Sequence, residues 1–149
     1  MHLAFKLKNN MSTETKKIEF NGEFGAKVGK INDFLKNFEP HNYGKDHKGY
    51  SGYKPQWIID AVNQEFCGEW TLEVLERETI EVDFKGKTVQ HALVRVRVTL
   101  GGQSIEAFAS HPNVQGDIGD TYKSAQTDAM KKAFAHFSIG NRAYHGLLK

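Results

Sequence analysis

The stretch TVQHALVRVRVTL (88–100) decides the fold, because apolar and polar side chains alternate through its second half. One parity carries only apolar residues: Val94, Val96, Val98 and Leu100. The other parity carries Arg95, Arg97 and Thr99. This period of two predicts a strand with one buried and one solvent-facing side. Gly101-Gly102 follows and predicts a hairpin turn into a further strand, QSIEAFAS (103–110).

A second long strand is expected before this one, over WTLEVLERETIEVDF (70–84), with the turn Lys85-Gly86 between the two. Its apolar residues share one parity: Trp70, Leu72, Val74, Ile80, Val82 and Phe84. Glu76 and Glu78 interrupt that parity midway. Two charges on an otherwise apolar face predict a β-bulge or a bend at this point.

Three segments have helical spacing: 24–38, 55–68 and TYKSAQTDAMKKAF (121–134). The last has Asp120 as a candidate N-cap, and a line of small and apolar residues is expected to face the sheet: Ala125, Ala129, Ala133 and Phe137. The order helix-helix-strand-strand-strand-helix predicts an α+β fold. We expect an antiparallel three-stranded β-meander packed against helices, a β-β-β-α core preceded by two helices.

Length and composition limit the classes of protein to which this sequence can belong. The 149 residues fit one domain, which we place at 18–149, after a flexible N-terminal tail at 1–17. The formal net charge of +2 does not by itself indicate a polyanionic partner. The single cysteine, Cys67, excludes an internal disulfide framework and favours a reducing compartment. No stretch is apolar enough to cross a bilayer, so a soluble intracellular protein without membrane contact is expected.

Three features are typical of nucleic-acid binding, and each has a plainer alternative. Lys123, Lys131 and Lys132 lie on the 121–134 helix and could bind phosphates or form a solvated face. Arg95 and Arg97 point to one side of their strand and could track phosphates or form cross-strand ion pairs with acids such as Glu73. The loop 41–54 interleaves rings with positive charge, which suits base stacking but also describes an aromatic surface loop. The loop residues with candidate roles are Lys48, Tyr50, Tyr53 and Lys54.

Enzymatic signatures are missing from the sequence. The histidines form no HExxH pattern, there is no CxxC pair, and neither a Walker-type loop nor a GxSxG elbow occurs. Cys67 is expected in the core rather than as a nucleophile, and Asp117 and Asp120 are expected to cap a helix. We therefore predict no catalytic residue, no metal site and no cofactor.

The segment KSAQTDAMKKAF (123–134) resembles the signature helix of the RAD fifty-two-type single-strand annealing proteins. IGNRAY (139–144) resembles their bacterial and phage branch, which includes the phage annealases and DdrA-like proteins. YSGYKPQWIIDAVNQEFCGEW (50–70) is similar to an earlier helix of that superfamily, and VRVRVTL (94–100) to its central strand. The resemblance implies a ring or filament that holds single-stranded DNA in a basic groove, with neither ATP nor metal. By position, Lys54, Lys131 and Lys132 match backbone-binding residues and Arg97 a strand arginine. Two positions depart from the pattern: Ala135 replaces a basic residue and Ser138 a glycine.

The resulting hypothesis is ATP-independent single-stranded DNA binding and annealing, or protection of DNA ends, in recombination and repair. The protein would act as a homo-oligomer in the cytoplasm of a bacterial or phage-infected cell, close to the nucleoid. A single-strand binding protein or a recombination protein is a candidate partner. A double-stranded RNA-binding module is the alternative, because its α-β-β-β-α order overlaps this one. A magnesium-dependent nuclease using Asp117 or Asp120 is a third hypothesis.

Overall fold

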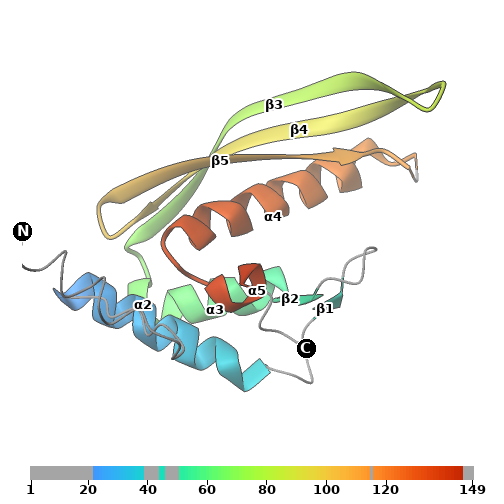
Figure 1. Cartoon of the computed structure of the whole chain (residues 1–149). Coiled ribbons are helices and arrows are strands. Elements are labelled where there is room, and N and C mark those ends of the chain that lie inside the picture. The colour runs from blue at the N-terminus through green and yellow to red at the C-terminus, as the bar shows by residue number, and fades with distance from the viewer. Residues whose placement is uncertain (1–21, 39–43, 46–50, 115, 146–149) are drawn as a thin grey trace, which may run out of the picture.

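The computed structural model describes residues 22–38, 44–45, 51–114 and 116–145. The expected N-terminal tail, 1–17, lies outside these residues. Three strands form one antiparallel sheet in the order β3-β4-β5: β3 (Trp70–Phe84), β4 (Lys87–Leu100) and β5 (Gln103–Pro112). Hence the meander and the α+β class predicted from the sequence are confirmed (Figure 1).

A β-bulge divides β3 into two halves. Val74 lies opposite Val96, whereas Glu76 lies opposite Arg95, so Leu75 is the extra residue. The predicted irregularity is therefore confirmed. The alternation of residues along the sequence did not predict its effect on the second half of β3. Beyond the bulge every side chain changes face, so that Thr79 lies on the same side as Ala92 and reaches Tyr122 of α4 by a hydrogen bond. The second apolar half of β3 then faces away from α4, and Phe84 is exposed.

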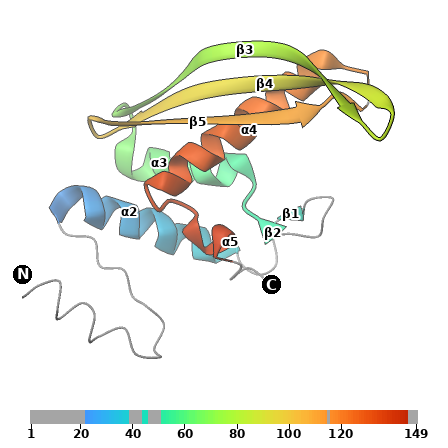
Figure 2. The same ribbon diagram turned by 45° about the horizontal axis from the view of Figure 1, so that its top comes forward.

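The long helix α4 (Ile118–His136) covers one face of the sheet (Figure 2). Its Ala125 and Ala129 are fully buried against Val94 and Val96. Small side chains let the helix axis approach the strands closely, which explains an alanine line at this contact. The buried alanine line is as predicted, but the N-cap is Asp117 rather than Asp120. Asp117 accepts a hydrogen bond from the Asp120 backbone N–H at 3.2 Å, because the helix begins earlier than its sequence pattern suggested.

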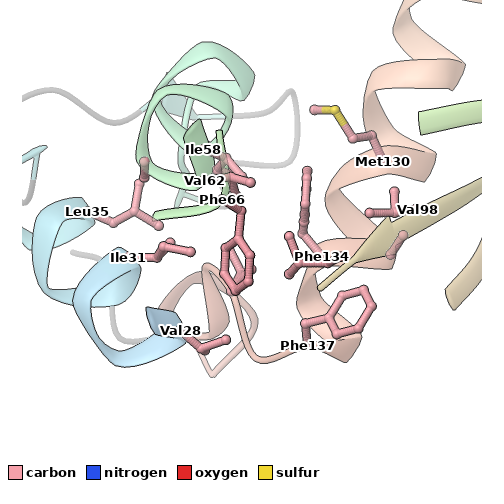
Figure 3. Packing of buried hydrophobic residues seen from close by; sticks show 14 of the residues in the cluster. Val28, Ile31, Leu35, Ile58, Val62, Phe66, Val98, Met130, Phe134 and Phe137 are labelled. Carbon is pink, nitrogen blue, oxygen red and sulfur yellow. The ribbon is translucent and has the colours of Figure 1, made fainter. Parts of the chain in front are cut away.

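Two further helices lie beyond the end of α4: α2 (Gly22–Leu35), followed by the 3-10 turn η1 (Lys36–Phe38), and α3 (Pro55–Phe66). Pro55 occupies the first turn of α3, as expected of a residue whose missing N–H has no helical partner there. Phe66 of α3 lies between α2 and Phe134 of α4 (Figure 3). Cys67 follows α3 and is exposed, so its predicted core position is wrong: it lies one residue past the helix and turns outward.

The chain after α4 turns back against α2. Ser138 adopts φ +66°, in the left-handed region, and ends the helix. The Asn32 side chain of α2 holds this turn: its amide donates to the Ser138 carbonyl at 2.8 Å and its oxygen accepts from the Gly140 N–H at 2.9 Å. A short helix, α5 (Asn141–Tyr144), follows and lies beside the small pair β1 (Gly44–Lys45) and β2 (Ser51–Gly52) (Figure 1). Within the described ranges, no helix is long and apolar enough to span a bilayer.

Candidate nucleic-acid interface

Lys131 joins two segments that are far apart in the sequence. It lies on α4, and its ammonium is 3.6 Å from the position that a β-carbon on Gly52 of β2 would occupy. Lys131 is half-buried. Consequently α4 and the segment that precedes α3 form one surface at this point.

Lys54 stands at the other end of the same short segment. It is exposed, immediately precedes α3, and its ammonium lies 5.2 Å from the centroid of the Trp57 ring, a cation–π distance. Between Gly52 and Lys54, the Tyr53 ring is only 3% exposed and packs against Gly140. A ring so buried offers no free face to a base, so in this structure Tyr53 anchors the segment instead of stacking. Lys48 and Tyr50 lie outside the described residues.

Lys132, the neighbour of Lys131, points to a different side of α4. Its ammonium is 3.4 Å from a carboxylate oxygen of Asp128, one helical turn earlier. The same oxygen lies 3.6 Å from Nε2 of His111 on β5. Burial and the nearby Asp128 charge also raise the pKa of the Tyr144 hydroxyl, which keeps that phenol neutral. Lys132 is thus an exposed cation whose charge is partly offset by one carboxylate.

Lys123 lies two helical turns before Lys131, about 12 Å along the axis at 1.5 Å per residue. It is exposed and forms no ion pair with any residue that the structure describes. Since residues four apart share one helix face, the expected line of Lys123, Thr127 and Lys131 is present on α4.

The arginines lie on the opposite side of the sheet from α4, because the intervening valines are buried under that helix. Arg95 contacts Glu76 at 3.2 Å and Glu106 at 3.5 Å. Arg97 contacts Glu106 at 3.0 Å and Glu73 at 3.7 Å. The cross-strand ion pairs considered as the alternative therefore form, and the structure does not bring Arg95 or Arg97 next to Lys131.

A sequence profile described as "Rad52/22 family double-strand break repair protein" matches residues 28–146, which is most of the chain. This protein belongs to the Rad52/22 family. No curated protein sequence matches the chain. Membership associates the protein with DNA recombination, double-strand break repair and single-strand annealing. The narrower assignment to a phage or bacterial branch stays a prediction.

This Rad52/22 family protein also has a groove that the sequence did not predict. It lies between β5, the second half of α4, and α5, and encloses about 520 Å³. Its walls come from three segments: Glu106, Ala107, Phe108, Lys132, Ala135, His136 and Tyr144. Only Lys132 among these was a predicted site residue. The others carry no local signal, since their proximity depends on how α5 folds back after Ser138.

A metal-dependent nuclease was the third hypothesis raised by the sequence. Across the ranges that the structure describes, no three side chains of the His, Cys, Asp or Glu type come together as metal ligands. Asp117 caps α4, and its carboxylate contacts the backbone of Asp120.

Proposed function

We propose that this Rad52/22 family protein binds single-stranded DNA and anneals complementary strands without ATP, as a homo-oligomer. The proposed contacts to the DNA backbone are Lys54, Lys123, Lys131 and Lys132. The observation that carries the proposal is the approach of Lys131 to Gly52, which places Lys131 and Lys54 at the two ends of the short segment 52–54.

Lysine suits this task because its ammonium is a compact charge that can rotate to meet phosphates at varied positions. Contacts to phosphate hold a strand without reading its sequence, so the base edges stay free to find a complement. A net charge of +2 is small for one chain. Repetition of the lysine cluster from subunit to subunit in a ring or filament would turn it into a continuous positive track. Protection of DNA ends would use the same hold on the strand.

Arg95 and Arg97 are proposed as secondary contacts only, since their charges already meet three glutamates on the far side of the sheet. The predicted contacts of Lys48 and Tyr50 fall on a segment outside the described residues, and they remain predictions. A single-strand binding or recombination partner, and a location near bacterial or phage DNA, are likewise predictions.

The test is the double variant Lys131→Ala/Lys132→Ala, measured by fluorescence anisotropy with a labelled oligonucleotide over a range of salt concentrations. If each lysine meets one phosphate, the slope of log affinity against log salt falls by about 1.4, because each single-strand contact contributes roughly 0.7. The matched control is Lys30→Ala/Lys36→Ala, which removes the same charge from exposed lysines of α2 and η1. Equal slopes in the two double variants would exclude the α4 lysines as the DNA contact.

Annealing and assembly are measured on the same proteins. Two complementary labelled strands should pair faster when the protein is present without ATP. Addition of ATP should not change the rate of pairing. The native mass should exceed that of one chain. A monomer that binds duplex RNA in preference to single-stranded DNA would instead support the RNA-binding alternative.

A further inference from the structure

The groove beside β5 adjoins the proposed DNA contact but is not explained by it. Lys132, one of the proposed DNA contacts, lies on its wall. A volume of about 520 Å³ is in the range of pockets that hold small organic groups. The following inference rests on the proposed function and adds a specific contact to it.

Two aromatic residues of the lining are exposed, and Phe108, which lies opposite Arg95, is on the face of the sheet away from α4. Tyr144 of α5 is 54% exposed and Phe108 of β5 is 66% exposed. The lining also includes the small residues Ala107 and Ala135, which take up little of the groove. Exposed rings beside cations are the arrangement on which bases of an unpaired strand stack.

The polar groups of the groove also suit a nucleotide. His136 is hydrogen-bonded through Nδ1 to the Lys132 carbonyl at 2.8 Å, and because a carbonyl only accepts, Nδ1 carries the proton. Its Nε2 is therefore the nitrogen left for a ligand. The one acid on the wall, Glu106, is held at 3.0 Å by Arg97 and at 3.5 Å by Arg95, so its charge is offset. The Tyr144 phenol stays neutral, so it adds no negative charge next to a phosphate.

From this geometry we infer that the groove holds one unpaired nucleobase, stacked on Tyr144 and bordered by Phe108, with the adjoining phosphate at Lys132. Stacking uses the face of a base and leaves its pairing edge free, so the contact is compatible with annealing. Contacts between lysines and phosphates alone would make the affinity depend only on the charge of the strand. The stacked base would add a contribution that depends on the presence of a base.

The experiment compares two oligonucleotides of equal length and charge, one of thymidines and one abasic. Wild-type protein should bind the thymidine strand more tightly. Tyr144→Ala should weaken binding of the thymidine strand by at least about fivefold, the lower end of the range for one stacked base, and leave abasic binding unchanged. Phe108→Ala should change binding in the same direction. Tyr144→Phe keeps the ring and should bind as wild type, whereas Tyr144→Leu keeps apolar bulk without the ring and should behave as Tyr144→Ala.

The matched control is Phe84→Ala, which removes an equally exposed ring at the far end of the sheet, 64% exposed. It should bind both strands as wild type. The inference is overturned if Tyr144→Ala binds thymidines normally, if it loses both strands equally, or if it changes the native mass, which would make the groove a subunit contact. These results differ from failure of the proposed function, in which wild-type protein binds neither strand.

Discussion

The Lys131 ammonium lies 3.6 Å from the position that a β-carbon on Gly52 would occupy. The contact between α4 and β2 at this point is therefore between a charged side chain and a glycine. This distance is ordinary van der Waals contact. Any side chain at position 52 would stand next to the charge. The pair can therefore be used to change the charge of the proposed DNA contact without touching α4.

Gly52→Asp should place a carboxylate within ion-pair reach of Lys131 and weaken single-stranded DNA binding. Loss of one phosphate contact lowers the slope of log affinity against log salt by about 0.7. Over the tenfold range from 1 M to 0.1 M salt, this difference corresponds to a roughly fivefold loss of affinity. Gly52→Asn is the matched control, because it has nearly the same shape and strand propensity without the charge. Binding should be measured by anisotropy at low salt. An equal loss in both variants would indicate that the strand pair, and not the charge, was disturbed.

Asp128 offsets Lys132 at 3.4 Å, and its removal should strengthen DNA binding. An exposed i,i+4 pair contributes about 0.3–0.5 kcal/mol, so Asp128→Asn is expected to raise affinity about twofold and to steepen the salt dependence. Asp60→Asn on α3 removes the same charge from an exposed carboxylate that accepts from Gln56, and should leave affinity unchanged. Weaker binding by Asp128→Asn would mean that the carboxylate orients Lys132 and does not compete with phosphate.

Arg95→Ala/Arg97→Ala removes as much charge as the double lysine variant but should weaken DNA binding less. The arginines meet three glutamates at 3.0–3.7 Å on the face away from α4, so their charges are already offset and attract a phosphate less. The free energy of unfolding should fall by about 1 kcal/mol or less per pair, because both partners are partly exposed. Oligonucleotide titration and urea denaturation measure the two effects. A loss of affinity equal to that of Lys131→Ala/Lys132→Ala would place the DNA path on the open face of the sheet.

Glu106→Gln gives an independent check on the same arginines. It removes the carboxylate that both of them contact and leaves their charges less offset. If Arg95 and Arg97 touch DNA, this variant should bind more tightly than wild type. Unchanged affinity would agree with a purely structural role for the two arginines.

The parts of the fold that follow from local sequence patterns were predictable. Alternation over 88–100 predicted β4, and the interruption at Glu76 predicted the bulge, because each depends only on which neighbours along a strand share a face. The alanine line of α4 was predictable for the same reason. By contrast, the face reached by Ile80 or Phe84 depends on the single extra residue of the bulge, and simple parity misplaces it.

The candidate site was only partly predictable, because chemistry can be read from the sequence but proximity cannot. Lys54 and Lys131 were identified by residue type, and the structure adds that Gly52 connects them. Tyr53 was assigned to stacking because it alternates with charges, but the packing of α5 buries it. The turn at Ser138, which precedes α5, also leaves Tyr144 exposed at the groove. The residues next to Tyr144 in the sequence do not indicate this position.

That turn also gives a stability prediction, because Ser138 adopts φ +66° without the conformational freedom of glycine. A left-handed conformation costs a residue with a side chain about 1–2 kcal/mol, and glycine gives back part of this through the greater freedom of the unfolded chain. Ser138→Gly should therefore raise the free energy of unfolding by roughly 1 kcal/mol. Ser124→Gly, in the exposed interior of α4, should lower the free energy of unfolding by about 0.5 kcal/mol or less, because serine lies between alanine and glycine in helix propensity. Urea denaturation distinguishes these two glycine variants by sign. A decrease in both would mean that the serine side chain contributes a contact that outweighs its backbone strain.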